Sequence, residues 1–360
     1  MRAILLNPGP VSLSEGVRRA AVATDLCHRE EEFFDLQDRL RAGLLKVYGN
    51  DADEWTAVML GGSGTTAMEA MIVSLIPRDA RVLVLENGVY GERLSRIAEL
   101  HRIAAKSIHW NWQEAWDLEE VAQSLGSGTF SHVLAVHHET TTGRLNPVDK
   151  LATLCERYGS ALLADSVSAF GAEDMPFSSP ALVACAATAN KCLHGITGLC
   201  LVICRKEALG LVDKPRSLTL HLPLWAAQQA ERSTPFTPPV NAMQALDQAL
   251  VELKCQGGWK VRQARYSELA EEISGVLAHL GVEPLLPAGA SSCVLRAYRL
   301  PVGVPYKVVH DGLKKQGFVI YAGQGALARD IFRISTMGEI GDDDTRRLLD
   351  ALDAVLGGSQ

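Results

Sequence analysis

The 360-residue sequence has no block of Lys and Arg residues, and its 35 basic residues are outnumbered by 42 acidic ones, for a formal net charge of −7. Nucleic-acid-binding domains carry clustered positive charge, so no nucleic-acid partner is expected. No apolar run approaches the roughly 20 residues that cross a membrane. The apolar start of the chain breaks at Pro8, Gly9 and Pro10, too early for a signal peptide. We therefore expect a cytoplasmic protein that acts on small molecules and has no membrane partner.

The sequence also lacks any Cys-x-x-Cys pair, although it contains eight cysteines. They are scattered, and several lie inside apolar runs, as is typical of reduced cysteines in a protein core. His137 and His138 are adjacent, but no group of His, Cys and carboxylate residues has the spacing of metal ligands. The sequence thus predicts reduced core cysteines and no metal site.

Apolar runs that alternate with helical patterns begin near residue 55 and end near residue 204. Near-continuous apolar strands separated by helices are typical of a mostly parallel sheet covered on both faces. The clearest runs are residues 57–60, 81–85, 132–136 and 161–164. They predict an α/β domain.

The alternation stops at a Pro- and Thr-rich segment, residues 233–239, and one long helical pattern follows over residues 240–280. We expect this long helix to connect the α/β domain to a smaller α+β domain. The patterns that predict the smaller domain are strands at residues 293–300, 318–321 and 331–335 around a helix at 306–316. The predicted division is an N-terminal arm at residues 1–15, a large domain at 16–250 and a small C-terminal domain at 251–360.

A segment rich in glycine and hydroxyl groups, residues 61–66, follows the first predicted strand and runs into a helical pattern. Glycine lets the backbone approach an anion, hydroxyl groups add donors, and the free N–H groups of a helix start complete a phosphate site. The segment has neither the Gly-Lys-Ser/Thr of a nucleotide P-loop nor Gly-x-Gly-x-x-Gly. It predicts a phosphate site, with a structural tight turn as the alternative.

Asp165 and Lys191 are the two candidate catalytic residues. Asp165 ends the apolar run at residues 161–164, where open α/β sheets bind ligands, and Lys191 closes another apolar stretch. Burial favours the neutral amine that reacts with a carbonyl group. Alone, Asp165 is typical of a helix N-cap and Lys191 of a protein surface. The order of phosphate loop, strand-end carboxylate and lysine, however, indicates an enzyme that uses pyridoxal 5′-phosphate (PLP).

Arg333 lies in the otherwise apolar strand predicted at residues 331–335. Its planar fork matches a carboxylate or a phosphonate, so we expect it to hold a substrate anion. An ion pair with a nearby Asp or Glu is the alternative. Cys293 leaves a persulfide-forming PLP lyase as another alternative, although its neighbours have the pattern of a buried strand.

These segments, in order along nearly the whole chain, resemble the class V aminotransferases. The matching segments are residues 5–10, 62–65, 87–93, 138–143, 165–171, 189–192 and 332–335. Within that family they are most similar to the branch that converts 2-aminoethylphosphonate and pyruvate to phosphonoacetaldehyde and L-alanine. The resemblance implies a fold-type I homodimer with a mostly parallel seven-stranded sheet in the large domain and a smaller C-terminal α+β domain.

The resemblance also implies roles for individual residues. Lys191 would hold the cofactor, Asp165 would pair with its ring nitrogen, and Arg333 would grip the anion of the amino donor or the keto-acid acceptor. The implied cofactor contacts are Ser63, Gly64, Thr65, Tyr90, Thr140, Asp165, Val167, Asn190, Lys191 and, reaching the cofactor of the partner subunit, Thr237. The implied substrate contacts are Pro8, Gly9, His28, Arg29 and Arg333.

Two segments depart from the family pattern. Thr197 stands where the family usually has Pro, which affects the local turn. Residues 25–33, with His28 and Arg29, look like the alanine- or serine-glyoxylate branch rather than the phosphonate branch. An alanine- or serine-glyoxylate aminotransferase is therefore the first alternative function, and a non-catalytic PLP-binding protein is the second.

Overall fold

A seven-stranded sheet dominates the part of the chain that the computed structural model describes, residues 3–212 and 214–357. Its strand order is β2-β10-β9-β8-β5-β3-β4, and within it only β10 runs antiparallel to its neighbours. The strands are β2 (Trp55–Gly61), β3 (Arg81–Glu86), β4 (Ala104–His109), β5 (His132–Val136), β8 (Ala161–Asp165), β9 (Leu182–Thr188) and β10 (Leu199–Arg205). The predicted mostly parallel seven-stranded sheet is confirmed.

Helices cover both faces of this sheet, because its apolar strands must be buried on both sides. One face is covered by α3 (Gly64–Leu75), α4 (Val89–Leu100) and α7 (Leu222–Ala230). The other is covered by α2 (Glu31–Lys46), α5 (Leu118–Ser127), α6 (Val148–Tyr158) and α8 (Val240–Cys255). All of β5 is buried, and after His132 it appears in the sequence as an unbroken apolar run, whereas the edge strand β4 is mostly exposed.

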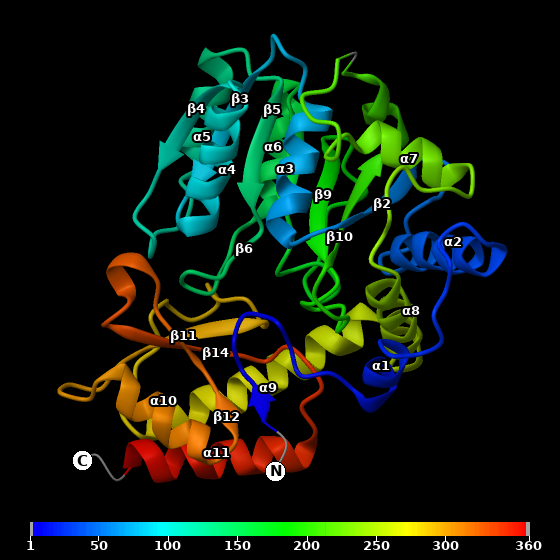
Figure 1. The fold of residues 1–360 in the computed structure, drawn as a ribbon. Helices are drawn as coiled ribbons and strands as arrows, with labels where there is room; N and C mark the ends of the chain where they lie inside the picture. The colour runs from blue at the N-terminus through cyan, green and yellow to red at the C-terminus, as the bar shows by residue number, and fades with distance from the viewer. Residues whose placement is uncertain (1–2, 213, 358–360) are drawn as a thin grey trace.

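A second body of secondary structure lies below the large sheet in Figure 1 and is built on a three-stranded antiparallel sheet. Its strands and helices are β11 (Leu295–Arg299), β13 (Tyr321–Ala322), β14 (Ile331–Ser335), α9 (Trp259–His279), α10 (Tyr306–Lys315) and α11 (Asp342–Leu356). The first strand of the chain, β1 (Ile4–Leu5), pairs in parallel with β12 (Phe318–Val319). The N-terminal segment is therefore part of this α+β body.

The long helix predicted over residues 240–280 is wrong, because the chain forms two helices there. The first, α8, ends at Cys255, and α9 starts at Trp259. Between them, Gly257 and Gly258 have φ angles of +99° and +85°, a left-handed conformation that ends a helix. Strong helix formers on both sides continue the apolar pattern across this break, so periodicity alone did not reveal it.

The buried carboxylate of Glu173, which follows β8 in the chain, joins the two bodies. It accepts hydrogen bonds from Ser292 Oγ (2.5 Å), Cys293 N (2.9 Å) and Gln263 Nε2 (3.0 Å).

The shorter elements are α1 (Glu15–Ala20), β6 (His138–Glu139), β7 (Arg144–Leu145), η1 (Lys206–Gly210) and η2 (Gly325–Leu327). None of the helices in the described ranges combines the length and hydrophobicity needed to cross a membrane.

Candidate active site

The carboxyl ends of the parallel strands meet at the sheet edge that faces the second body (Figure 1). In open α/β sheets this edge is where ligands bind. The residues singled out from the sequence follow five of these strand ends: residues 62–65 after β2, Tyr90 after β3, Thr140 after β5, Asp165 at the end of β8 and Lys191 after β9.

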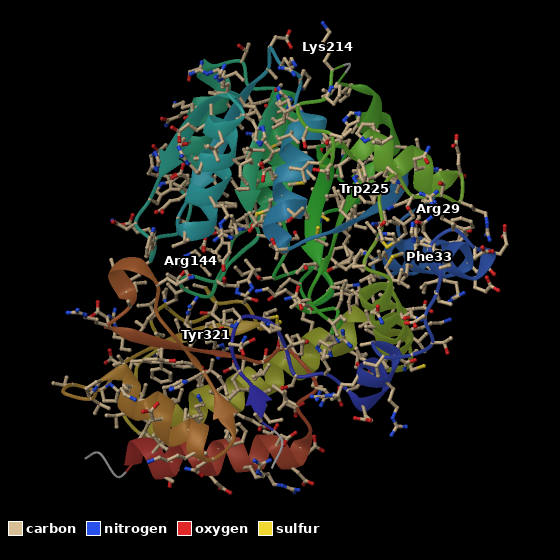
Figure 2. All side chains as sticks on the ribbon, viewed as in Figure 1. Arg29, Phe33, Arg144, Lys214, Trp225 and Tyr321 are labelled. Atoms are coloured by element: carbon tan, nitrogen blue, oxygen red, sulfur yellow. The ribbon has the colours of Figure 1, made fainter. Side chains whose placement is uncertain are left out.

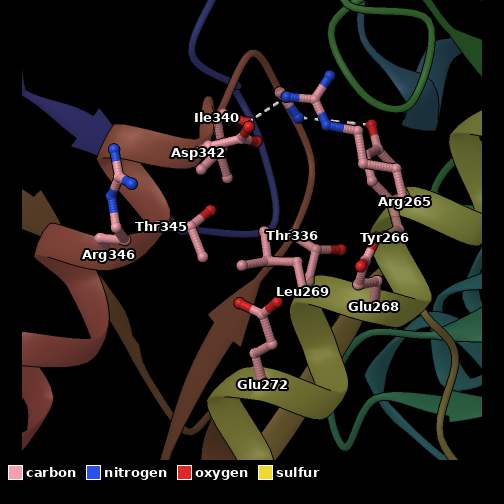
Figure 3. Close-up of a pocket in the computed structure, with 11 residues that line it drawn as sticks. Arg265, Tyr266, Glu268, Leu269, Glu272, Thr336, Ile340, Asp342, Thr345 and Arg346 are labelled. Carbon is pink, nitrogen blue, oxygen red and sulfur yellow. Dashed lines mark hydrogen bonds between the residues drawn. The ribbon is translucent and has the colours of Figure 1, made fainter.

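A separate cavity of about 430 Å³, shown in Figure 3, lies between α9, the segment after β14 and α11. Its lining carries charges of both signs, including Arg265, Glu268, Glu272 and Arg346. The guanidinium of Arg265 already donates to the carbonyl oxygen of Ile340. None of the residues predicted to act in catalysis or binding lines this cavity, so we place the candidate site at the sheet edge instead.

The side chain of Lys191 contacts Pro8 and Gly9 of the N-terminal segment. Its Nζ donates a hydrogen bond to the carbonyl oxygen of Pro8. A Cβ atom on Gly9 would lie only 2.7 Å from Lys191 Cδ, so glycine leaves the space that the lysine fills. Burial lowers the pKa of Lys191 to about 8, so the neutral amine is much more populated near neutral pH than it is for an exposed lysine. The structure thus brings together Pro8, Gly9 and Lys191.

Asp165 is buried at the end of β8, and its Oδ1 accepts a hydrogen bond from the backbone N–H of Val167 at 3.0 Å. This hydrogen bond is the one expected of a capping Asp, but the positive charges of Arg93 and Lys191 also act on the carboxylate. Burial raises the pKa of Asp165 to about 6, and those two charges work against the rise. The carboxylate is therefore ionised at neutral pH, within electrostatic range of Lys191.

The start of α3 is the candidate anion site. Ser63 is its N-cap, and the Ser63 N–H donates to Thr66 Oγ1 at 3.1 Å. In the described part of the chain, the N–H groups of Gly64 and Thr65 have no hydrogen-bond acceptor, as is usual in a first helical turn. Free N–H groups at the positive end of a helix dipole attract an anion. A Cβ on Gly64 would lie 2.5 Å from Val167 Cγ1, so Val167 packs directly against this loop.

Arg93 is a member of the site that sequence reasoning missed. Its Nη1 donates to Thr65 Oγ1 at 3.1 Å, and its guanidinium carbon lies 4.6 Å from the centre of the Tyr90 ring. Arg93 thereby links the start of α4 to the start of α3 and adds positive charge beside the anion site. Its one-turn spacing from Tyr90 was a signal, since both lie in the segment that matched the family.

Arg333 projects from β14 and is almost completely buried, with 2% of its surface exposed. Its Nε donates to Ala322 O (2.9 Å), and its Nη1 donates to Thr140 O (2.7 Å) and Gln324 Oε1 (3.3 Å). Within the described ranges it forms no ion pair, so the alternative of a local Asp or Glu partner has no support there. A buried cation whose hydrogen-bond partners are all neutral is suited to an external anion.

Three predicted contacts lie outside this cluster within one chain. Figure 2 shows Arg29 beside Phe33, in the region of α2 and far from Tyr321, which pairs with Arg333 across β13 and β14. Arg29 is exposed, and the ring of His28 packs edge-on against Phe33 at 6.5 Å. Thr237 is also exposed. Its expected contact with the cofactor of a partner subunit, and the substrate contacts expected of His28 and Arg29, stay predictions.

The contact of Asn190 is local. Its Oδ1 accepts a hydrogen bond from Thr188 Oγ1 at 2.8 Å, which shapes the turn that leads into Lys191. The side chain of Asn190 forms no hydrogen bond with the other predicted residues in the described ranges, so its contact with the cofactor also stays a prediction.

The cysteines are all free, but the expectation that they lie in the core is wrong for Cys27 and Cys255, which are exposed. Cys293 is buried, and burial raises its pKa well above the ordinary value. It therefore stays a thiol and is poorly suited to act as the nucleophile of a lyase. In the described ranges no three His, Cys, Asp or Glu side chains are grouped to hold a metal ion.

Comparison with known proteins places this geometry in context. The aminotransferase class-V family matches residues 18–287. Over 358 residues the chain is 33% identical to a 2-aminoethylphosphonate–pyruvate transaminase of Phocaeicola vulgatus, covering 98% of each chain. A protein of the same name from Vibrio vulnificus is 34% identical over 360 residues, covering 98% of this chain and 97% of the other. The solved structure of an alanine–glyoxylate aminotransferase from Nostoc sp. has a TM-score of 0.91 at 25% identity, covering 99% of this chain and 96% of that one.

Proposed function

Since the chain belongs to the class-V aminotransferase family, and is thus a PLP-dependent transaminase of fold type I, we propose that it transfers the amino group of 2-aminoethylphosphonate to pyruvate. The products would be phosphonoacetaldehyde and L-alanine. The observation that carries this substrate assignment is the similarity, over 98% of the chain, to transaminases of that name from two organisms. The buried Arg333, which has only neutral partners, supports it because both substrates carry an anionic group.

The residues at the sheet edge fit PLP. The free N–H groups of Gly64 and Thr65 suit its phosphate, and Asp165 suits a protonated ring nitrogen. Thr140 Oγ1 is buried with no hydrogen-bond partner in the described ranges, which suits a ring hydroxyl. When bound, the cofactor supplies an electron sink that makes the hydrogen on the carbon next to the amino group acidic.

Lys191 and Asp165 would then carry the chemistry of the protein itself. The neutral amine of Lys191 would hold the cofactor, and when free, Lys191 Nζ would accept the proton from the substrate carbon that bears the amino group. With a pKa of about 6, Asp165 is mostly ionised at neutral pH and would favour a protonated ring nitrogen. Burial favours the neutral amine that Lys191 needs, whereas at Asp165 burial opposes the ionised form and the positive charges of Arg93 and Lys191 favour it.

Arg333 would serve both halves of the reaction. A transaminase that works by a ping-pong mechanism uses one pocket for two substrates in turn, so the same guanidinium would bind a phosphonate and then a carboxylate. Thr140 O and Ala322 O hold the guanidinium in place without neutralising its charge. The cation thus remains available to both anions.

We also propose that the active unit is a cytoplasmic homodimer. Thr237, His28 and Arg29 are assigned to the site by resemblance but lie outside it within one chain, and a second copy would supply them. Eight free cysteines are consistent with a reducing compartment. Sedimentation of the purified protein with bound cofactor tests the dimer directly.

An alanine- or serine-glyoxylate aminotransferase is the second candidate, favoured by the similarity to the Nostoc enzyme and by residues 25–33. A screen that crosses 2-aminoethylphosphonate, alanine and serine with pyruvate and glyoxylate separates the two. We expect alanine to form fastest from 2-aminoethylphosphonate and pyruvate. A clear preference for glyoxylate with serine or alanine would replace the proposed substrates and leave the cofactor assignment intact. No turnover with any pair would favour a PLP-binding protein without catalysis.

A further inference from the structure

A buried carboxylate at the centre of the site has no role in the function proposed so far. Glu139, at the end of β6, has no exposed surface and forms no ion pair within the described ranges. Burial raises the pKa of Glu139 to about 7, while hydrogen bonds from Thr141 and Gly91 oppose the rise. Burying an ionisable group without a counter-ion costs free energy, so its hydrogen bonds must compensate.

Glu139 is the cap of a helix to which it does not belong. Its Oε2 accepts the backbone N–H groups of Tyr90 and Gly91, both at 3.2 Å, in the first turn of α4. The N-cap position of α4 is Gly88, which has no side chain to bind those donors. A Cβ on Gly88 would lie 2.2 Å from Glu139 Cδ, so the absence of a side chain there also makes room for the carboxylate.

The other oxygen of the same carboxylate organises its own loop. Glu139 Oε1 accepts hydrogen bonds from Thr141 Oγ1 (2.6 Å) and Thr141 N (3.2 Å). Thr141 Oγ1 in turn accepts the N–H of Val89 at 3.1 Å. The loop after β5 therefore binds three successive N–H groups at the start of α4.

The hydrogen bonds of Glu139 join the two segments, α4 and the loop at residues 139–141, that contact the candidate anion site and Arg333. On α4, Tyr90 lies under the guanidinium of Arg93, which reaches Thr65 at the anion site. On the loop, Thr140 follows Glu139 directly, and the Thr140 carbonyl oxygen accepts the hydrogen bond of Arg333. A shift of the loop against α4 would therefore move the cofactor contacts and the anion clamp relative to each other.

We propose that Glu139 is a positioning residue: its carboxylate locks the start of α4 to the loop at residues 139–141, and so sets Tyr90 and Thr140 around the cofactor ring. This role rests on the proposed PLP site but on neither proposed substrate. It goes beyond helix stability, because the cap joins two segments that carry different cofactor contacts.

Glu139→Gln tests the proposal, because an amide retains the size of the side chain but places at most one acceptor oxygen where two are needed. We expect the dissociation constant of PLP, titrated into cofactor-free protein at 25 °C, to rise about tenfold. We also expect a weaker visible circular dichroism band of the bound cofactor, which reports how rigidly the ring is held.

Asp117→Ala is the matched control. Asp117 caps α5 by accepting the N–H groups of Glu119 (2.9 Å) and Glu120 (3.3 Å), but it is exposed and contacts no residue of the site. It should lower the melting temperature of the cofactor-free protein without changing the affinity for PLP. If Glu139→Gln behaves in the same way, with a lower melting temperature and wild-type affinity and dichroism, the positioning role is wrong.

A second pair of variants covers the case in which Glu139→Gln does not fold. Thr141→Val removes the hydroxyl that binds both Glu139 and Val89 N, whereas Thr141→Ser keeps it. We expect weaker PLP binding in the valine variant only, and equal affinities in both would contradict the proposal. Because every readout uses the cofactor alone, a failure of the substrate assignment would leave this test unaffected.

Discussion

At the edge of the seven-stranded sheet, polar side chains and free N–H groups follow five strand ends, whereas the three-stranded sheet contributes one long side chain, Arg333, from its central strand. The charges of the first group act on each other, since Lys191 and Asp165 each alter the pKa of the other. Arg333 is held by carbonyl oxygens and keeps its full charge. The predicted cofactor contacts and the predicted anion clamp thus lie on separate sheets, and substitutions should separate their effects.

Among the residues at the edge of the seven-stranded sheet, we expect Lys191→Ala to have the largest effect on activity. It removes both the amine that holds the cofactor and the base that moves the proton, so we expect turnover to fall by about 10⁴-fold or more. The visible absorption band of the bound cofactor should disappear, while far-ultraviolet circular dichroism stays that of the folded wild type. A variant that kept the band and near-normal activity would show that another residue holds the cofactor.

Asp165→Asn should leave the cofactor bound but slow the reaction on the order of a thousandfold, because a neutral amide no longer stabilises a proton on the ring nitrogen. Single-turnover rates with excess amino donor measure this step alone. An unchanged rate would mean that Asp165 acts only through its hydrogen bond to Val167 N.

Substitutions of Arg333 test whether anion binding is separate from cofactor binding, since they should weaken substrate binding without changing the affinity for PLP. Arg333→Ala should weaken binding of both 2-aminoethylphosphonate and pyruvate by about 10- to 100-fold, as expected for lost charge-assisted hydrogen bonds. Arg333→Lys keeps the charge without the two-pronged geometry and should lose about tenfold with each. Half-reaction rates across a substrate series check this, with the PLP dissociation constant as the control. Wild-type efficiency with both substrates would place the anion elsewhere, with His28 and Arg29 as the next candidates.

The smallest effect we expect is a pH dependence of cofactor attachment. Only neutral Lys191 reacts with PLP, and burial lowers its pKa to about 8. The rate of attachment to cofactor-free protein should therefore rise about tenfold per unit below pH 8 and become constant above it. A rise that continued to pH 10 would mean that the lysine titrates as if exposed to solvent.

The sequence predicted where the residues at the edge of the seven-stranded sheet lie better than it predicted the contacts that join them. Buried strands such as β5 and β14 appear as apolar runs with the bounds that the structure has, so the residues at their ends could be placed. Arg93 and Glu139 were missed because their partners come from other elements. The lack of a capping side chain at Gly88 was the available signal, since it requires an acceptor from elsewhere.

The second body was harder to read from sequence. Its first strand, β1, comes from the N-terminus and pairs with β12, a contact between residues far apart in the chain that no local pattern encodes. The break between α8 and α9 depends on the conformation of Gly257 and Gly258 rather than on the apolar spacing. Arg333 was nevertheless recognisable, because a cation inside an apolar strand needs an anionic or polar partner.

The most direct test of the substrate assignment is a stopped-flow half-reaction of the wild-type protein with bound cofactor and no acceptor. We expect 2-aminoethylphosphonate alone to abolish the visible band in one exponential phase and to release one equivalent of aldehyde per subunit. Pyruvate alone should then restore the band with one equivalent of alanine. A band that 2-aminoethylphosphonate leaves intact, but serine or alanine abolishes, would contradict the assignment.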